Sequence, residues 1–141
     1  MIYKNFYHST AIQLRFKDVD KQGHVNNANH LTYAETARVN YFADVLGRNI
    51  DWDETGILLA RTEIDYKQPI FLSDEIFCFS KVTEIGTKSF VMTFVLAKKS
   101  GIEIIECAIG KCTLVCYNYP SRTTIQIPEK WRSEFKVFEK I

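Results

Sequence analysis

The pattern of apolar and polar positions changes its period near residue 27. Residues 8–17 alternate as a strand does. From residue 27 to about residue 46, apolar residues recur at helical spacing instead, which predicts one long, mostly apolar helix at the centre of the fold. Asn26 or Asn27 can cap the start of this helix, and Gly47 is suited to end it.

Strand patterns dominate after the helix. We predict four strands, over residues 57–67, 74–85, 88–98 and 102–117. The last three are separated only by turn sequences such as Gly86-Thr87 and Ser100-Gly101, so we expect them to form an antiparallel meander. A short helix over residues 128–138 follows.

This order predicts an α+β fold. We expect a single domain over residues 1–141, with an antiparallel sheet of about five strands wrapped around the long helix. The strand at 102–117 carries apolar residues on both faces, which predicts burial on both sides. Since one helix covers only one face, we expect a second subunit to cover part of the other.

Composition excludes several classes of protein. The chain has 141 residues and a net charge of +1, which gives no basic field for nucleic acid. No segment approaches the ~18 apolar residues of a membrane span, and the start lacks the apolar run of a signal peptide, so we expect a cytoplasmic protein. The cysteines lie in apolar runs without metal-ligand spacing, so we expect buried thiols and no zinc: Cys78, Cys107, Cys112 and Cys116.

The most distinctive segment lies directly before the predicted helix. It reads Asp18-Val19-Asp20-Lys21-Gln22-Gly23-His24-Val25-Asn26-Asn27. The unsatisfied N–H groups and the positive dipole end of a helix N-terminus can polarise a carbonyl, and the nearby carboxylates can act on it. Taken alone, Asp18 and Asp20 fit equally well as turn or capping residues.

The segment 15–28 resembles the signature of the hotdog-fold acyl-CoA thioesterases of the 4-hydroxybenzoyl-CoA thioesterase type. It also resembles the D-x-N-x-H-V-N-N segment of plant acyl-ACP thioesterases. The strand order agrees, and looser similarities occur at residues 65–69, 86–89 and 125–128. The resemblance implies a hotdog fold that hydrolyses an acyl-CoA or acyl-ACP thioester without a metal or other cofactor. It also implies sites between the subunits of a homodimer or homotetramer.

The resemblance further implies that Asp20 is the catalytic carboxylate, which attacks the thioester carbonyl or activates a water. We expect the Gly23 N–H to polarise the carbonyl, because glycine lets a ligand approach the backbone closely. In the plant enzymes the His that matches His24 acts together with an Asn, and Gln22 stands at the position of that Asn. Two roles therefore stay open for His24: catalysis, and packing under the start of the helix. Asn27 is expected to face the thioester or to cap the helix.

Other candidates are weaker. By the resemblance, Ser89 would contact the thioester or the attacking water across the dimer interface. Arg122 is a candidate for binding coenzyme A phosphates, although a surface arginine usually serves only solubility. Glu35 offers a second carboxylate on the helix, and its ordinary role would be an ion pair with Arg38 one turn further on. His30 stands where family members usually carry Tyr or Phe, and we expect it to pack locally.

Apolar residues near the end of the predicted helix and after it can form a pocket for either a fatty or an aromatic acyl group: Tyr41, Phe42, Trp52, Ile57 and Leu58. The rival function is a non-catalytic protein that binds acyl thioesters or a carrier protein. Asp20 argues against that rival, because a binding protein needs no carboxylate beside the carbonyl.

Overall fold

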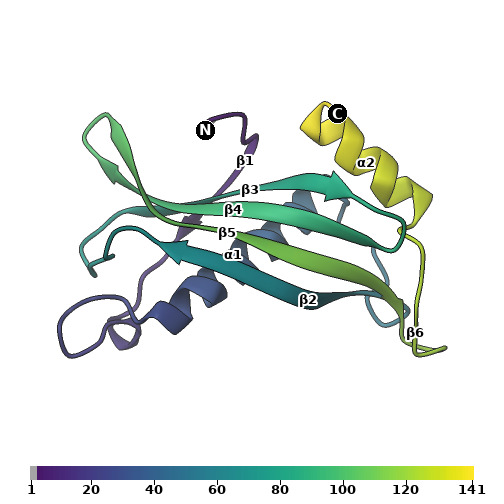
Figure 1. Cartoon of the computed structure of the whole chain (residues 1–141), viewed down its shortest axis with the longest axis horizontal. Coiled ribbons are helices and arrows are strands. Elements are labelled where there is room, and N and C mark those ends of the chain that lie inside the picture. Colours follow the sequence, from purple (N-terminus) through teal and green to yellow (C-terminus); the bar gives the residue numbers. More distant parts are fainter. Residues whose placement is uncertain (1–2) are drawn as a thin grey trace.

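The computed structural model describes residues 3–141 as a curved antiparallel sheet with one long helix against its concave face (Figure 1). The elements are β1 (His8–Ile12), a 3₁₀ turn (Phe16–Asp18), α1 (Asn27–Val45), β2 (Thr55–Tyr66), β3 (Ile76–Ile85), β4 (Ser89–Ser100), β5 (Glu103–Asn118), β6 (Thr123–Thr124) and α2 (Glu129–Glu139). The strand order is β1-β3-β4-β5-β2, and β6 pairs with β5. The predicted α+β architecture, including the β3-β4-β5 meander, is confirmed.

The first strand is shorter than the alternation predicts. It ends at Ile12, and the chain then leaves the sheet. The Asp18 N–H donates to the Arg15 carbonyl at 2.9 Å, and the Asp18 carboxylate accepts the Arg15 N–H at 3.1 Å. These two bonds close a turn, so the alternating residues before Asp18 belong to an irregular connection. The short strand β6 was also missed, since two paired residues leave no periodic signal.

The ends of α1 follow from local chemistry. The Asn26 side chain accepts the Ala28 N–H at 3.0 Å, so Asn26 is the N-cap and Asn27 is the first helical residue. The alternative of Asn27 as the cap is therefore wrong. At the other end, Gly47 has φ of +95°, the left-handed conformation that glycine adopts without steric cost.

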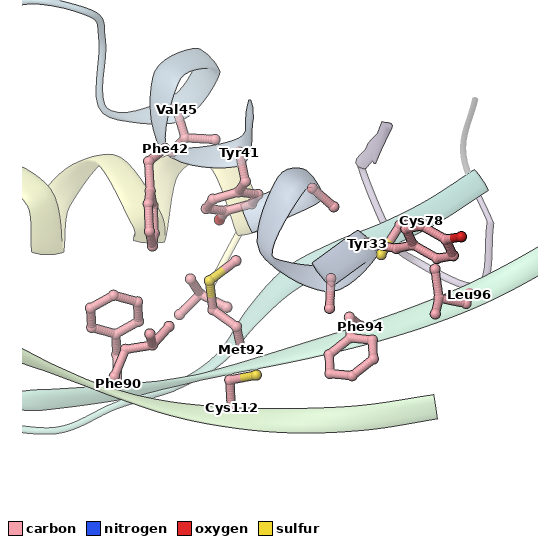
Figure 2. Packing of buried hydrophobic residues seen from close by; sticks show 14 of the residues in the cluster. Tyr33, Tyr41, Phe42, Val45, Cys78, Phe90, Met92, Phe94, Leu96 and Cys112 are labelled. Carbon is pink, nitrogen blue, oxygen red and sulfur yellow. The ribbon is translucent and has the colours of Figure 1, made fainter. Parts of the chain in front are cut away.

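The main core lies between α1 and the concave face of the sheet. Figure 2 shows Tyr41 and Phe42 of α1 directed toward the strands, where Phe90, Met92 and Cys112 meet them. The helix α2 closes one end of this core, and its Phe135 ring lies 4.9 Å from the Phe90 ring. All four cysteines are buried and free, as predicted, and burial raises the pKa of Cys78 to about 12.

The convex face of the sheet carries a second buried cluster. It consists of Phe6, Phe79, Val95 and Ala97, with the Tyr3 ring 4.8 Å from the Phe79 ring. The chain's own N-terminal turn therefore covers part of the face for which we expected a second subunit. Sequence reasoning missed this cover, because the turn at residues 3–6 had no periodic signal, and cover of the rest of the face by a second subunit stays a prediction.

The strand β2 lies at one edge of the sheet (Figure 1). It pairs with β5 on one side, and among residues 3–141 no strand pairs with its other side. Leu58 and Leu59 on this strand are exposed. Unpaired edges with exposed apolar residues are typically covered by another chain or element. Among the described residues, neither helix is long and apolar enough to cross a membrane.

Candidate active site

The loop before α1 is closed by its own backbone. The Asp20 N–H donates to the His24 carbonyl at 2.7 Å, and the Gly23 N–H donates to the Asp20 carbonyl at 3.0 Å. Gly23 has φ of +83°, so this turn requires the left-handed conformation that glycine permits. The predicted loop between strand and helix is thus a defined, hydrogen-bonded turn.

The Asp20 carboxylate is exposed and oriented by the same turn. Its Oδ1 accepts the Gln22 N–H at 2.9 Å and the His24 N–H at 3.2 Å. Within residues 3–141, no hydrogen bond engages Oδ2. One oxygen therefore fixes the side chain, and the other is available as a nucleophile or a base.

We expected the Gly23 N–H to polarise a carbonyl, but in this structure it donates to the Asp20 carbonyl within the turn. The first turn of α1 offers a different donor. The Ala28 N–H is taken by the Asn26 side chain, and the Asn29 N–H donates to the Asn26 carbonyl at 2.9 Å. The Asn27 N–H has no acceptor in the part of the chain that the structure describes, so it is the donor left at the helix N-terminus.

Contacts from distant elements hold the loop and the helix start in place. The Val25 N–H donates to the Ile70 carbonyl at 2.7 Å, and the Asn26 N–H donates to the Asp18 carbonyl at 2.8 Å. The Tyr66 hydroxyl, at the end of β2, donates to the Asn27 carbonyl at 3.2 Å. The site therefore lies at the end of the sheet where β2 finishes.

Asp18 is a buried anchor rather than an exposed turn residue. Its carboxylate pairs with the Arg15 guanidinium at 3.3 Å and accepts the Tyr33 hydroxyl at 2.7 Å. Burial alone would raise the pKa of Asp18, but the hydrogen bonds from Tyr33 and Arg15 outweigh it and hold the pKa below its usual value. Sequence reasoning missed this role, because the Tyr33 partner lies fifteen positions along the chain.

Two histidines flank the site. The His24 ring is half-buried and lies 5.0 Å from the Phe71 ring, edge to face. His30 is buried on the first turns of α1, with its ring 5.0 Å from that of Tyr66. Burial lowers the pKa of His30, and its Nδ1 has no hydrogen-bond partner among the described residues. His30 therefore packs as a neutral ring, in agreement with the expectation of a local packing role.

Within one chain, the structure does not bring Ser89 or Arg122 to Asp20. Ser89 pairs with Val115 near the opposite end of the sheet, and Arg122 lies in the exposed turn between β5 and β6 (Figure 1). That turn adjoins Thr55, the first residue of β2, whereas the site adjoins its last residue. These two predicted substrate-binding residues and the candidate carboxylate thus lie at opposite ends of β2.

A groove runs along α1 beside β2. Its larger part has a volume of about 650 Å³, and the lining includes Phe42, Trp52, Ile57 and Leu58, four of the five residues expected to form an acyl pocket. Tyr41, the fifth, is fully buried in the core. Glu35 also lines the groove, and it forms the predicted ion pair with Arg38 at 3.8 Å.

Comparison with known proteins agrees with this arrangement. Residues 14–135 match the model of the thioesterase-like superfamily. The long-chain acyl-CoA thioesterase FadM of Escherichia coli (strain K12) is 22% identical over 130 residues, which are 90% of this chain and 96% of that protein. The uncharacterized protein YsmA of Bacillus subtilis (strain 168) is 24% identical over 111 residues, 79% of this chain and 73% of that protein.

Solved structures share the whole fold. A thioesterase from Thermus thermophilus, crystallised with coenzyme A and Zn, has a TM-score of 0.84 and 30% identity, and the match covers 99% of this chain and 98% of that one. Slr0204, a 1,4-dihydroxy-2-naphthoyl-CoA thioesterase from Synechocystis, has a TM-score of 0.79 and 16% identity, and the match covers 91% of this chain and 94% of that one. At this low identity the likeness shows only a common fold. The protein therefore belongs to the thioesterase-like superfamily and is a hotdog-fold thioesterase.

Proposed function

We propose that the protein hydrolyses acyl-CoA thioesters, with Asp20 as the catalytic carboxylate and the Asn27 N–H as the donor to the thioester carbonyl. The observation that carries this proposal is the Asp20 carboxylate, with Oδ1 held by two backbone N–H groups and Oδ2 unbonded within residues 3–141. A carboxylate held in this way before a helix N-terminus can act without first breaking a hydrogen bond of its own.

In the general-base form of the reaction, Oδ2 of Asp20 takes a proton from a water as the water oxygen attacks the thioester carbon. The carbonyl oxygen becomes an oxyanion, which accepts the Asn27 N–H at the positive end of α1. The tetrahedral intermediate then collapses, the C–S bond breaks, and the thiolate recovers the proton from Asp20. In the nucleophilic form, Oδ2 attacks the carbon directly, the C–S bond breaks, and the thiolate leaves. Water then hydrolyses the resulting mixed anhydride, which releases the carboxylic acid, restores the Asp20 carboxylate and supplies the proton that the thiolate takes up.

The remaining predicted residues support this chemistry in different ways. The His24 backbone, through its N–H and its carbonyl, holds both the side chain and the main chain of Asp20. The Asn27 side chain is exposed beside the donor N–H and is suited to bind the thioester or the attacking water. Gly23 serves by giving the turn its left-handed residue.

A second copy of the chain gives Ser89 and Arg122 a role. The unpaired edge of β2 can pair antiparallel with the same edge of another copy about a two-fold axis. Such pairing places the Thr55 end of one β2 beside the Tyr66 end of the other. Ser89 and Arg122 of one copy then approach Asp20 of the other, so we propose a homodimer, alone or within a homotetramer, as the working form.

The donor of the acyl group is proposed to be coenzyme A. The relative FadM is named for acyl-CoA substrates, and the related Thermus structure holds coenzyme A. An acyl-ACP donor is the alternative within the same chemistry. Kinetics on matched acyl-CoA and acyl-ACP pairs separates the two donors.

The experiment that tests the mechanism measures thiol release from acyl-CoAs of short, long and aromatic acyl groups. We expect Asp20→Asn to keep the fold and to lose at least ~100-fold in kcat, the lower end of what positioned acid–base groups contribute. Asp53→Asn is the matched control, because Asp53 is exposed and its carboxylate has no partner in residues 3–141. Full activity of Asp20→Asn overturns the assignment, and binding without turnover by the native protein favours the non-catalytic rival.

The dimer has its own test. Light scattering at micromolar concentration should give at least twice the 16.4 kDa chain mass. Leu58→Glu, on the unpaired edge of β2, should shift the protein toward monomer. A native protein that scatters as a monomer contradicts the proposed assembly.

A further inference from the structure

The groove along α1 begins about one turn after the start of the helix. A smaller cavity of about 150 Å³ is lined by Leu31 and Thr32, and it shares Glu35, Arg38 and Leu59 with the larger cavity of about 650 Å³. Leu31 lies four residues, or ~6 Å of helix axis, after Asn27. The near end of the groove therefore lies about one helical turn from the N–H proposed to bind the thioester carbonyl.

Aromatic side chains line the far end of the groove. Tyr119 packs so closely on Gly56 that a Cβ at residue 56 would lie 2.3 Å from the tyrosine ring. The Tyr119 N–H also donates to the Glu54 carbonyl at 2.9 Å, which fixes the turn that carries the ring. Trp52 lines the same cavity, and its ring lies 6.3 Å from that of Phe42. These rings lie at the Thr55 end of β2, opposite to the site.

The walls between the two ends are mainly apolar. Val39, Leu58 and Leu59 line the groove and are exposed in the single chain, which is unfavourable unless something apolar covers them. Ala43 on α1 leaves the distal half of the groove wide, because it has only a methyl group. The Arg38 guanidinium is engaged by the Cys112 sulfur at 3.6 Å and by Glu35, so it is not an open anion site.

We propose that this groove selects a long, unbranched acyl chain that runs beside α1 from Asn27 to Tyr119 and Trp52. This inference rests on the proposed function and names its substrate class. From Asn27 to Ala43 the helix rises ~24 Å. A residue of extended backbone spans ~3.6 Å over three bonds, or ~1.2 Å per bond, so the groove accommodates a chain of up to roughly 20 carbons. An aromatic acyl group is too short to reach Tyr119 from the same carbonyl position.

Two variants test the path of the chain. Ala43→Phe fills the distal half of the groove. We expect kcat/KM to fall at least ~10-fold for acyl-CoAs of 16 and 18 carbons. For acyl-CoAs of 4 and 6 carbons, kcat/KM should stay within about twofold of the native value. Tyr119→Ala removes the ring at the far end of the groove, and we expect the preference to move to chains longer than about 20 carbons. Val137→Phe is the control for the first variant, because Val137 is exposed on α2 and lies outside the groove.

Each outcome decides the proposal. Loss of the long chains alone in Ala43→Phe, with a shift to longer chains in Tyr119→Ala, supports it. An unchanged chain-length profile in both folded variants overturns it, as does equal loss of short and long chains in Ala43→Phe. The native protein must first turn over some acyl-CoA. If it turns over none, the proposed function fails, and that result is distinct from failure of the groove assignment.

Discussion

The Tyr33 hydroxyl donates a 2.7 Å hydrogen bond to Oδ2 of the buried Asp18, which joins the second turn of α1 to the segment that leads into the loop of Asp20. The same residue holds the loop by its main chain. The Asp18 carbonyl accepts the Asn26 N–H at 2.8 Å and the Asn29 side-chain amide at 3.1 Å. Asp18 therefore holds the loop that carries Asp20, the proposed catalytic carboxylate, against the start of α1.

Tyr33→Phe should destabilise the protein by ~1.5–3 kcal/mol, because it removes a hydrogen bond to a charged, buried carboxylate. Urea unfolding measures the free energy of unfolding. Tyr7→Phe is the control, since the Tyr7 hydroxyl makes no hydrogen bond in residues 3–141. Equal stability of the two variants would show that the Tyr33–Asp18 bond contributes nothing.

The buried His30 should make stability depend on pH. Its pKa is lowered in the folded state by burial, whereas in the unfolded chain it returns to about 6.5. The unfolded state therefore binds the proton first, and the free energy of unfolding falls as the pH drops below ~6.5. His30→Phe keeps a ring against Tyr66 but cannot titrate. Urea midpoints at pH 8 and pH 5.5 should fall more for the native protein than for the variant, and parallel losses contradict the prediction.

A buried carboxylate also fastens the C-terminal helix. Oε1 of Glu139 accepts the Tyr41 hydroxyl at 2.6 Å and the Val82 N–H at 3.1 Å. Burial and the bond to the Glu139 carboxylate raise the pKa of Tyr41. Glu139→Ala leaves both donors buried without an acceptor, which should cost ~2–4 kcal/mol in unfolding free energy. Glu139→Gln retains an acceptor oxygen and is the matched control. An alanine variant as stable as the glutamine variant would argue that water replaces the carboxylate.

The elements that sequence reasoning located correctly are those with a local cause. The period of residues 27–46 and the cap at Asn26 determine α1, and the turn residues Gly86 and Gly101 separate the strands of the meander. The end of β1 was missed, because it depends on Asp18 closing a turn that Tyr33 stabilises from another element. Such a contact has no periodic signal in the chain.

The site was predicted only as far as its residue types. Asp20 and the helix start follow from the motif, but which N–H is left unbonded depends on how the loop closes. The Gly23 N–H donates to the Asp20 carbonyl, whereas the Asn27 N–H has no acceptor among residues 3–141. Tyr66, which holds Asn27, lies in the segment 65–69 where the family resemblance was loose, and that segment was the available signal for it.

The role of His24 can be decided by separating its ring from its backbone. Both contacts of His24 to Asp20 use main-chain atoms, and the ring packs edge to face on Phe71 at 5.0 Å. A phenylalanine ring can make the same packing contact, so we expect His24→Phe to retain kcat within ~10-fold, below the ~10²–10⁴-fold that a positioned acid–base group contributes. His24→Ala, which loses the packing against Phe71, should instead lower stability.

The pH profile of kcat/KM provides the second readout for His24. If packing is its whole role, the profile of His24→Phe should keep the shape of the native one. A loss above ~100-fold in a folded His24→Phe, with removal of one limb of the profile, would assign acid–base chemistry to the imidazole. Asp20 would then act together with His24, and the backbone of the loop would hold both partners of a catalytic pair.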